Sequence, residues 1–372
     1  MTTAKFEDGN MTVRVGVIGT SAWAERMYMQ ALKNHPDGAV TAVCARDHDR
    51  THDFARRWNI PNVYTDWRDL LDSDIDAVII VTPNHTHYPI TMHALKNDLH
   101  VLCEKPLALN YVHADTMATE AERRNLIGMT AFTQWFYPHH RYIATLMQQG
   151  IVGTPYSLNL RHNSATGITG NPAWRFDRRQ GGEGALFDIG SHAVSLARAF
   201  LGDIAAVSAN LPITVPRPGI PGQYRASDQA FINLQFTDGT PGIIHVTMVS
   251  HQAKTGGQKQ AIEISGSKGT LYYYNDFSTQ FSLQFAQHGD DAPTELHVPD
   301  IHWPPQVSRA NPRDMYADLF QKSNTMARAF VRAVADDHLP NGPDLREGAE
   351  VQKVLDAAIR SHQNNNQWEH IT

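Results

Sequence analysis

The chain has only two cysteines, Cys44 and Cys103, among its 372 residues, and it has neither a long apolar run nor an excess of basic residues. Two cysteines are too few for a disulfide framework and indicate a reducing compartment such as the cytoplasm. A membrane-spanning helix needs about 20 consecutive apolar residues, which the chain lacks. The start does not resemble a signal peptide, because residues 2–10 are polar and the first apolar stretch, residues 13–18, reads as a strand. The net charge of −6 argues against a nucleic-acid binder, which needs a basic patch. These absences predict a cytoplasmic globular protein with neither a membrane nor a nucleic-acid partner.

Short apolar segments alternate with amphipathic segments over the first 131 residues. Strands are predicted at residues 13–18, 40–45, 77–81, 100–103 and 126–130, and helices at 25–34, 50–58, 88–97 and 112–124. The strand segments are rich in Val and Ile and lack polar alternation, as expected for strands that are covered on both faces. Because this alternation implies βαβ units, residues 1–131 are predicted to form a Rossmann domain, an α/β fold with a doubly wound parallel sheet.

The pattern changes after residue 131, where apolar and polar residues alternate along residues 156–161, 232–236 and 244–248. This period of two indicates strands with one buried face, and Asp238-Gly239 marks a hairpin turn. Residues 132–372 are therefore predicted to form an α+β domain with a largely antiparallel open sheet and helices on one face. A capping residue, Asp344, and an apolar stripe behind it predict a packed C-terminal helix near 345–362.

The other face of that predicted sheet is polar. It carries Asn159, Arg161, Asn233, Gln235, His245 and Thr247. Such a face is solvated, forms a wall of a substrate site, or is an oligomer interface. We expect a homo-oligomer, either a dimer or a tetramer, that forms through this open face.

The turn after the first predicted strand resembles the dinucleotide fingerprint G-x-G-x-x-G/A, with Gly19, Ser21 and Ala24 at the three key positions. The first position makes the tight turn, the second admits the pyrophosphate, and the third lets helix and strand pack. Ser21 departs from glycine, but its hydroxyl can donate to a phosphate oxygen. An ordinary βα turn is the alternative. The turn is predicted to bind a dinucleotide through Gly19, Thr20, Ser21, Ala22 and Trp23.

The end of the second predicted strand bears on the choice between NAD and NADP. An acidic residue there binds the ribose 2′-hydroxyl of NAD, whereas an arginine suits the 2′-phosphate of NADP. Ala45 occupies the position expected to be acidic, Arg46 follows it, and Arg50 adds a second cation. Asp47 is the counter-evidence, because a shift of one residue would restore an acidic ligand. The match of guanidinium to phosphate favours NADP(H), with NAD(H) as the alternative.

Further motifs follow the predicted strands and occupy the middle of the chain. They read Thr82-Pro83-Asn84-His85-Thr86-His87, Glu104-Lys105-Pro106, Gly181-Gly182-Glu183-Gly184-Ala185-Leu186-Phe187-Asp188-Ile189-Gly190-Ser191-His192 and residues 264–271. With the N-terminal turn, this ordered set resembles the Gfo/Idh/MocA family of sugar and cyclitol oxidoreductases. The resemblance covers nearly the whole chain from Met11, and its specificity comes from the order of the motifs.

The resemblance implies catalytic roles for Lys105, Asp188 and His192, whose counterparts line the junction of nicotinamide and substrate in the family. Oxidation of a secondary alcohol needs a base for the hydroxyl proton while hydride leaves the carbon. His192 suits that role, because an imidazole exchanges a proton near neutral pH. Lys105 is expected to stabilise the reacting oxygen as an ammonium. Asp188 is expected to orient the imidazole or to bind a substrate hydroxyl.

The resemblance also implies residues that flank the cofactor and the substrate. Those expected beside the nicotinamide ribose or the lysine are Thr82, Pro83, Asn84, His87 and Glu104. Those expected to contact the substrate, besides the three catalytic residues, are Trp135, Arg161, Trp174 and Arg175. Trp135 is equally suited to stacking on a sugar and to a place in the core. A cis bond is expected before Pro106.

The 20 histidines do not predict a metal site. The closest pairs are His85 with His87 and His139 with His140, but no acidic or cysteine partner falls at zinc-site spacing. No bound metal is therefore expected.

The sequence predicts an NADP(H)-preferring oxidoreductase that acts on a hydroxyl or carbonyl group of a sugar, cyclitol or related polyol. One alternative is a non-catalytic regulator that senses dinucleotides, which would not need the proton-transferring residues. The other is a glycoside-cleaving enzyme that keeps its dinucleotide bound and oxidises the substrate transiently.

Overall fold

The computed structural model describes residues 12–171, 173–251, 257–322, 325–338 and 342–371, which form two compact units. Unit 1 contains the described residues up to Leu107, together with Val112–Ala131 and Ala317–Gly348, and unit 2 contains Ala108–Tyr111, Phe132–Tyr316 and the described residues from Ala349 onward. Apart from residues 108–111, the chain remains in unit 1 up to residue 131 and then enters unit 2. Residues 317–348 return to unit 1. They do so because helix α11 (Thr325–Ala335) buries Phe330 and Val331 in that unit.

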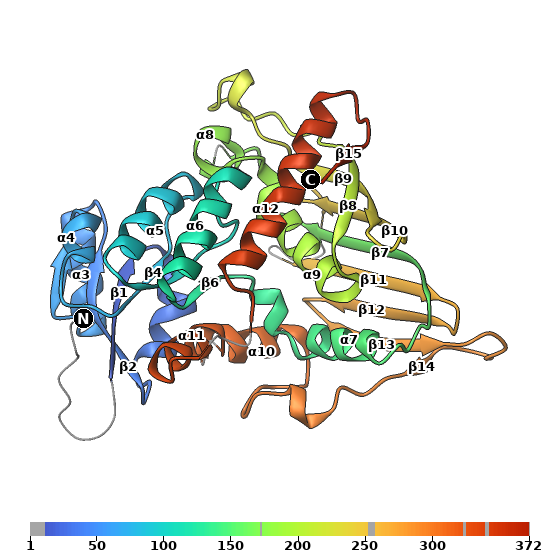
Figure 1. Ribbon diagram of the computed structural model, residues 1–372, viewed down its shortest axis with the longest axis horizontal. Helices are drawn as coiled ribbons and strands as arrows, with labels where there is room; N and C mark the ends of the chain where they lie inside the picture. The colour runs from blue at the N-terminus through green and yellow to red at the C-terminus, as the bar shows by residue number, and fades with distance from the viewer. Residues whose placement is uncertain (1–11, 172, 252–256, 323–324, 339–341, 372) are drawn as a thin grey trace. The chain divides into compact units, whose positions relative to one another are not determined.

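Unit 1 is built on a six-stranded parallel sheet in the order β3-β2-β1-β4-β5-β6. Figure 1 labels β1, β2, β4 and β6 of this sheet. Its strands are β1 (Val13–Ile18), β2 (Gly38–Cys44), β3 (Asn62–Tyr64), β4 (Ala77–Ile80), β5 (His100–Cys103) and β6 (Gly128–Thr130). The predicted doubly wound parallel sheet is confirmed, and β3 is a short strand that the sequence pattern misses. The strand order reverses at β1, so the ends of β1 and β4 form the switch point where sheets of this kind bind ligands.

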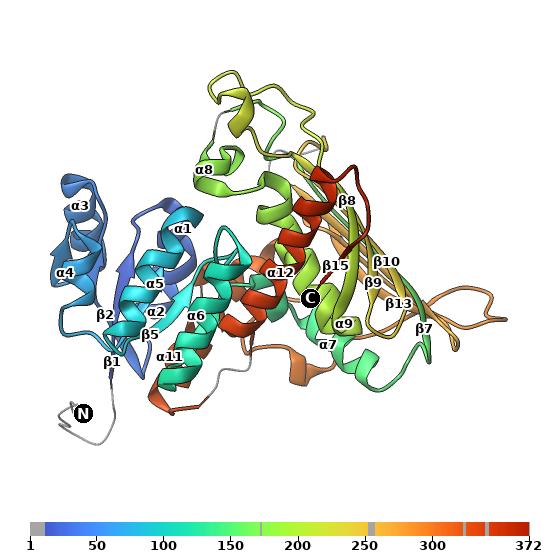
Figure 2. The same cartoon turned by 45° about the horizontal axis from the view of Figure 1, so that its top comes forward.

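Helices cover both faces of this sheet (Figure 2). They include α3 (His48–Trp58), α4 (Trp67–Leu71), α5 (His87–Lys96), α6 (Tyr111–Arg124) and α11. A Cβ on Gly16 of β1 would meet Leu70 of α4, whereas a Cβ on Gly38 of β2 would meet Val331 of α11. Gly38 pairs with Val13, and Val13 and Gly16 point to opposite faces because their separation is odd. The helices α4 and α11 therefore lie on opposite faces.

The first helical segment of unit 1 is irregular. Where the sequence predicts one helix at 25–34, the structure has α1 (Ala22–Ala24), a π-helical turn η1 (Glu25–Met29) and α2 (Gln30–Leu32) in succession. Met27, Tyr28 and Met29 of the π-helical turn are buried. A π-helical turn closes i→i+5 hydrogen bonds, and such turns are frequent at functional sites.

Unit 2 is built on a nine-stranded sheet in the order β14-β13-β12-β11-β7-β10-β9-β8-β15. Its strands are β7 (Pro155–Ser164), β8 (Ile204–Asn210), β9 (Gln229–Phe236), β10 (Pro241–Thr247), β11 (Gln258–Gly266), β12 (Thr270–Asp276), β13 (Gln280–Ala286), β14 (Thr294–Glu295) and β15 (Glu369–His370). The neighbouring pairs are antiparallel except β7 with β10. The largely antiparallel sheet is therefore confirmed. The hairpin between β9 and β10 is confirmed too, with Gly239 at a φ of 90°.

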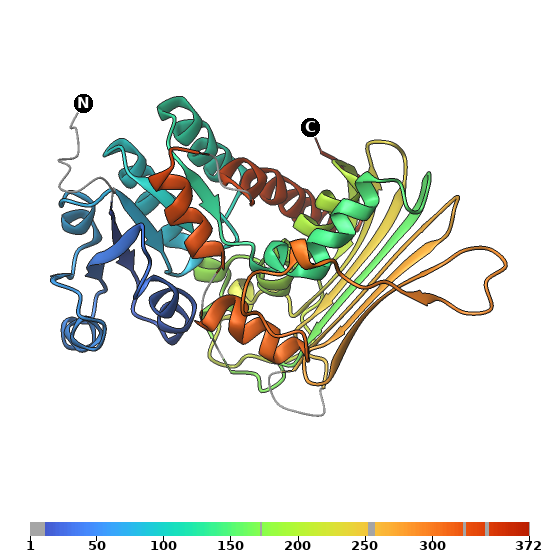
Figure 3. The ribbon, with the colours of Figure 1, turned by 90° about the horizontal axis from the view of Figure 1, so that it is seen from below.

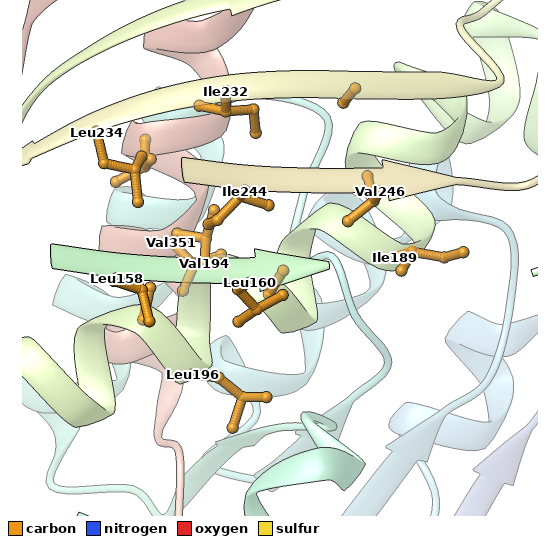
Figure 4. Close-up of a cluster of buried hydrophobic side chains, with 14 of the residues drawn as sticks. Leu158, Leu160, Ile189, Val194, Leu196, Ile232, Leu234, Ile244, Val246 and Val351 are labelled. Carbon is orange, nitrogen blue, oxygen red and sulfur yellow. The ribbon is translucent and has the colours of Figure 1, made fainter. Parts of the chain in front are cut away.

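Three helices cover one face of this sheet. They are α7 (Pro138–Gln148), α9 (Ser191–Leu201) and, from Ala349 onward, α12 (Leu345–Gln363). Figure 4 shows Leu158 and Leu160 of β7 in one apolar cluster with Val194 of α9 and Val351 of α12. Alternate residues of the strands enter this core, which explains the period of two in the sequence. The predicted cap of the C-terminal helix is present, because the carboxylate of Asp344 accepts the N–H of Glu347 at 2.7 Å.

The opposite face of the nine-stranded sheet is open: Figure 3 shows the helices α7 and α9 on one side of the strands. The predicted polar residues Asn159, Arg161, Asn233 and Gln235 are exposed, and His245 is half-buried. Thr247 differs from the prediction: it is 5% exposed, and its hydroxyl accepts the N–H of Val249 at 3.1 Å where β10 ends. Apolar side chains interrupt the polar face at Phe231 and Ile243, which are 42% and 51% exposed. The open face is therefore mixed rather than purely polar.

Both cysteines are free and buried. Burial raises the pKa of the Cys44 thiol to about 12 and that of Cys103 further still, so both stay protonated and unreactive at neutral pH. Among the described residues, no helix is long and apolar enough to cross a membrane.

Candidate functional site

The turn between β1 and α1 requires glycine at its first position. Gly19 has a φ of 121°, and a Cβ there would come within 2.2 Å of the carbonyl oxygen of Val81. The N–H of Gly19 donates to the carbonyl oxygen of Cys44 at 2.8 Å, and the N–H of Val81 donates to that of Ile18 at 2.8 Å. The turn is thus held between the ends of β2 and β4, at the switch point of the sheet.

Polar groups of the turn suit an anionic ligand. The hydroxyl oxygen of Ser21 caps α1 by accepting the N–H of Ala24 at 3.1 Å. Because a hydroxyl both accepts and donates, Ser21 keeps its hydrogen for a phosphate oxygen. Arg50 Nη2 donates to the carbonyl oxygen of Thr20 at 3.0 Å, which places a guanidinium against the turn. The glycine cradle, the hydroxyl and this cation fit a dinucleotide.

The residues that follow β2 carry two exposed cations and one engaged carboxylate. Ala45 comes directly after the strand, and Arg46 and Arg50 are exposed. Asp47 caps α3, and its Oδ1 accepts the N–H of Arg50 at 3.1 Å. One carboxylate oxygen of Asp47 therefore serves the helix, which weakens Asp47 as a ribose ligand.

The carboxylate of Glu104 is the centre of a buried hydrogen-bonded group in unit 1. Its Oε1 accepts the indole N–H of Trp23 at 2.6 Å and the hydroxyl of Tyr28 at 2.7 Å. Its Oε2 accepts the backbone N–H of Lys105 at 3.3 Å. The bond between Lys105 and Pro106 is cis, as expected. Lys105 is thus carried by a turn that contacts the helical segment next to the glycine turn.

His87 is placed differently from the expectation that it flanks the nicotinamide ribose. Its ring is completely buried, with Nδ1 at 3.0 Å from the carbonyl oxygen of Pro106 and Nε2 at 3.0 Å from that of Thr82. Burial lowers the pKa of this imidazole, while the two carbonyl groups oppose that shift. A ring with no exposed surface cannot contact a nucleotide, so His87 acts inside the protein. Thr82 and Pro83 are half-buried and Asn84 is 5% exposed.

The predicted catalytic residues of unit 2 follow one another along a helical segment. Asp188 lies in the π-helical turn η5 (Leu186–Gly190), and His192 lies in the first turn of α9. The side chain of Asp188 is 24% exposed, and its Oδ1 lies 3.5 Å from Nε of Arg175. His192 is 8% exposed and meets the ring of Phe132 edge-on, with 5.9 Å between centroids. Both side chains thus combine partial burial with access.

Trp174 and Arg175, which are predicted to contact the substrate, lie beside Asp188. They lie in the short helix η4 (Trp174–Phe176), where the Arg175 guanidinium lies over the Trp174 ring, 4.5 Å from its centroid. Together the three side chains present a carboxylate, a cation and an aromatic face. Such a combination suits a polyhydroxylated molecule, because a sugar offers hydroxyl groups and an apolar ring face.

Contacts with residues outside the stretch hold the glycine-rich residues before η5 in place. Gly184 has a φ of 48°, and a Cβ there would come within 1.9 Å of the carbonyl oxygen of Ser227. Glu183 is buried, pairs with Arg178 through two hydrogen bonds of 2.6 and 2.9 Å, and accepts the N–H of Ser227 at 3.1 Å. This network sets the direction in which η5 leaves the loop and so places Asp188.

Two other predicted substrate residues lie elsewhere in unit 2. Arg161 stands on the open face of β7, whereas its neighbours Leu160 and His162 point to the face covered by helices. Asp188 and His192 belong to helical segments packed on that covered face. The structure therefore separates Arg161 from the pair. Trp135, in the short helix η3 (Thr133–Phe136), is half-buried and has its indole nitrogen inside the protein.

Sequence reasoning missed several residues that hold these groups. They are Tyr28, Arg178, Glu183 and the buried ion pair of Arg217 with Asp228, in which the guanidinium lies over the ring of Phe176, next to Arg175. Glu183 lies inside a quoted motif, which was the one available signal for it. Tyr28 is ordinary in the sequence, and Arg217 sits in a proline-rich segment that reads as an exposed loop. Their roles depend on burial, which a single sequence does not display.

The buried histidines of unit 2 do not form a metal centre. Burial lowers the pKa of His139 to about 3 and that of His140 to about 4, so both are neutral at pH 7. His140 uses its two nitrogens on the carbonyl oxygen of Gln134 at 2.8 Å and the side chain of Gln260 at 2.9 Å. In the described part of the chain, no group of three or more His, Cys, Asp or Glu side chains is arranged to hold a metal ion.

Comparison with protein families gives two matches along the chain. Residues 13–132 match the oxidoreductase family with an NAD-binding Rossmann fold, and residues 140–272 match the GFO/IDH/MocA C-terminal domain. The first match covers the glycine turn and Lys105, and the second covers Asp188 and His192.

Curated relatives are distant. The chain is 28% identical to levoglucosan dehydrogenase of Pseudarthrobacter phenanthrenivorans over 64% of its own length and 65% of that protein. It is 27% identical to an uncharacterized oxidoreductase of Synechocystis over 95% of its length and 94% of the relative. It is 26% identical to myo-inositol 2-dehydrogenase of Thermotoga maritima, over 71% and 75% respectively.

Solved structures share the fold over almost the whole chain. An oxidoreductase domain protein from Kribbella flavida has a TM-score of 0.82 at 27% identity and covers 97% of this chain and 100% of its own. A levoglucosan dehydrogenase in complex with NADH and L-sorbose also has a TM-score of 0.82, at 24% identity, covering 97% and 99%. The folds of this chain are therefore found in known oxidoreductase structures.

Proposed function

Because this chain belongs to the Gfo/Idh/MocA family of oxidoreductases, we propose that it transfers a hydride between a nicotinamide dinucleotide and the carbon of a hydroxyl or carbonyl group on a sugar, cyclitol or related polyol. The observation that carries the proposal is Lys105, held on a buried turn that contacts the helix of the glycine turn through Glu104. Relatives named as levoglucosan and myo-inositol dehydrogenases support this substrate class.

The glycine turn holds the dinucleotide phosphates. Gly19 lets the backbone approach them closely, and the hydroxyl of Ser21 donates to a phosphate oxygen. Arg46 and Arg50 bind the 2′-phosphate and so favour NADP(H) over NAD(H), since guanidinium groups match phosphate geometry. The engagement of Asp47 as a helix cap supports that preference.

Lys105 and His192 divide the work at the reacting oxygen. The bound nicotinamide supplies the acceptor or donor for hydride. Lys105 donates a hydrogen bond from Nζ to the reacting oxygen and stabilises the negative charge that develops on it. A ring nitrogen of His192 takes the hydroxyl proton during oxidation and returns it during reduction. Asp188, which faces Arg175, binds a neighbouring substrate hydroxyl.

The open face of the nine-stranded sheet forms the interface of a homo-oligomer. Phe231 and Ile243 are exposed there, and Phe231 stacks on His245 with 4.2 Å between ring centroids. Apolar groups of this size on a sheet face favour contact with a second copy. Light scattering of Ile243→Asp should show a smaller particle than the unsubstituted protein. Ile301→Asp, at a residue 90% exposed outside the sheet, is the matched control.

A direct assay tests the activity. Absorbance at the NADPH or NADH wavelength is followed while sugars, cyclitols and polyols, including levoglucosan and myo-inositol, are supplied with each nucleotide. Lys105→Ala and His192→Ala should each abolish turnover and leave nucleotide binding largely intact, whereas Lys96→Ala, at an exposed lysine of α5, should leave both unchanged.

Three outcomes separate the proposal from other functions. Unchanged turnover in both Lys105→Ala and His192→Ala would overturn the assigned roles. Nucleotide binding with no turnover of any polyol would favour a sensor. Glycoside cleavage with tightly bound nucleotide and no net NADPH change would identify a glycoside-cleaving enzyme.

A further inference from the structure

The turn that carries Lys105 is held by side chains from two separate elements of unit 1. From the first helical segment, Trp23 Nε1 and Tyr28 Oη donate to Glu104 Oε1 at 2.6 and 2.7 Å. From the N-terminus of α5, the ring of His87 reaches the carbonyl oxygen of Pro106 at 3.0 Å. Residues 104 and 106, on both sides of Lys105, are therefore anchored.

The π-helical turn η1 makes the first anchor possible. Trp23 and Tyr28 are five residues apart, and in a regular α-helix they would point about 140° apart. A π-helical turn brings residues five apart onto the same side, because its hydrogen bonds close i→i+5. Both side chains consequently reach one carboxylate oxygen. The π-helical irregularity of this segment thus lets two side chains donate hydrogen bonds to the carboxylate of Glu104.

His87 supplies the second anchor and joins two loops. Its Nδ1 lies at the carbonyl oxygen of Pro106, after β5, and its Nε2 at the carbonyl oxygen of Thr82, after β4. Each nitrogen donates only when it carries a hydrogen, so a neutral ring donates to one of the two carbonyl groups. In either tautomer, the ring fills the space between the two strand ends.

We propose that Tyr28 and His87 are positioning residues, which hold the turn that carries Lys105 in a fixed position relative to the glycine turn. The proposal rests on the proposed function, in which Lys105 polarises the reacting oxygen. Tyr28 and His87 both have 0% exposed surface, so neither touches a substrate or a nucleotide. They act through Glu104 and Pro106, and the glycine turn and Lys105 behave as one rigid part.

Small displacements of such a turn have large kinetic effects. A shift of about 1 Å in a catalytic group costs up to about 100-fold in rate. Tyr28→Phe deletes one hydroxyl and leaves the ring in place, so it removes one of the two side-chain donors to Glu104 with little change in packing. His87→Gln keeps an amide donor near one carbonyl oxygen, whereas His87→Leu removes every donor.

The experiment measures kcat, KM, NADPH affinity and amide hydrogen exchange in the full-length protein. Tyr28→Phe and His87→Leu should each lower kcat by about 10-fold or more and leave the Kd of NADPH within about twofold, because they act on the turn and not on the nucleotide. His87→Gln should recover part of the loss. The amides of residues 104–107 should exchange faster in Tyr28→Phe. Tyr88→Phe, at a half-buried tyrosine of α5 that stacks on His113, is the matched control and should match the unsubstituted protein.

The outcomes decide the proposal independently of the reaction. Unchanged kcat and unchanged exchange of residues 104–107 in Tyr28→Phe would overturn it, as would a parallel loss of kcat and NADPH affinity. If the unsubstituted protein neither binds a nucleotide nor turns over a polyol, the proposed function fails. The exchange of residues 104–107 in Tyr28→Phe then still decides whether the anchor exists. If His87→Leu does not fold, Tyr28→Phe alone decides.

Discussion

Arg217 and Asp228 form an ion pair without exposed surface: Nη2 of the arginine lies 3.8 Å from Oδ2 of the aspartate, and both side chains are 0% exposed. The guanidinium also lies over the ring of Phe176, 3.5 Å from its centroid, and donates to the carbonyl oxygen of Gly167 at 2.9 Å. Phe176 follows Arg175 directly. The buried pair therefore fixes the loop that presents Arg175 to Asp188.

Arg217→Met should destabilise the protein strongly. Removal of one member of a buried ion pair leaves the other charge uncompensated, at a cost of about 3–5 kcal/mol. The carboxylate of Asp228 also accepts the N–H groups of Thr214 and Val215. These hydrogen bonds remain in Arg217→Met, but they do not neutralise the charge of the carboxylate. Denaturant unfolding of Arg217→Met, Asp228→Asn and the double variant measures the coupling. A double variant as unstable as the sum of the two single variants would contradict the pairing.

Cofactor preference should depend on Arg46. Loss of a guanidinium–phosphate contact costs about 1.5–3 kcal/mol, so Arg46→Ala should weaken NADPH binding by roughly 10- to 100-fold. NADH binding should change little, because NADH has no 2′-phosphate. Arg56→Ala, which removes an exposed guanidinium of α3 that pairs with Asp53, is the control and should alter neither. Equal losses for both nucleotides would contradict the assignment.

Stability should fall as the pH drops below about 6.5. Burial lowers the pKa of His139 to about 3 and that of His140 to about 4, whereas both titrate near 6.5 in the unfolded chain. Between these values only the unfolded chain binds the protons, so acid favours unfolding. The contribution of each of the two neutral histidines to the free energy of unfolding is fully present above pH 6.5. Below that pH it decreases by about 1.4 kcal/mol per pH unit for each histidine, or by about 2 kcal/mol each at pH 5.

His139→Leu isolates one of these contributions. His139 lies among the rings of Tyr273, Phe281 and Trp303, so an apolar residue suits the site. The Tm of His139→Leu should fall less steeply between pH 7.5 and pH 5 than that of the unsubstituted protein. His48→Gln, at an exposed histidine, should leave the slope unchanged. Identical slopes for His139→Leu and the unsubstituted protein would disprove this account.

Gly184→Ala should be far more damaging than Gly150→Ala. Both glycines have a positive φ, 48° and 70°, which costs an alanine about 1–2 kcal/mol. A Cβ at Gly150 meets open space, whereas at Gly184 it meets the carbonyl oxygen of Ser227. The extra backbone displacement should bring the Gly184→Ala cost to about 3 kcal/mol or more. Thermal unfolding of the two variants checks this, and equal Tm values would contradict it.

The fold was predictable where one local pattern decides it. β1, β4 and β5 are apolar runs because both faces are covered, and the alternation in β7, β9 and β10 reports one covered face. β3 and α4 were missed because they are short and have few buried residues. The return of residues 317–348 to unit 1 leaves no trace in the local pattern, since an amphipathic helix does not say which sheet it covers.

The motifs of the candidate site could be recognised in the sequence, whereas the buried residues that hold its side chains in place could not. Gly19, Lys105, Asp188 and His192 are proposed from motifs whose spacing is local. The burial of His87 was not, because a histidine after a strand end reads equally as a ligand contact or as a structural bridge. Arg161 shows the same limit, since the alternation of β7 places it on the open face but does not say what that face does.

The placement of α11 bears on how the protein is made. Unit 1 needs residues 317–348, and α11 packs against β1, β2 and β5. Synthesis proceeds from the N-terminus, and domains generally fold as they emerge. In this chain, the strands that leave the ribosome first are covered by a helix that is synthesised much later. Most of unit 2 is synthesised in between. A chain that terminates before residue 317 would therefore lack α11. Apolar surface of its N-terminal sheet would then remain exposed, where it promotes aggregation and binding by chaperones.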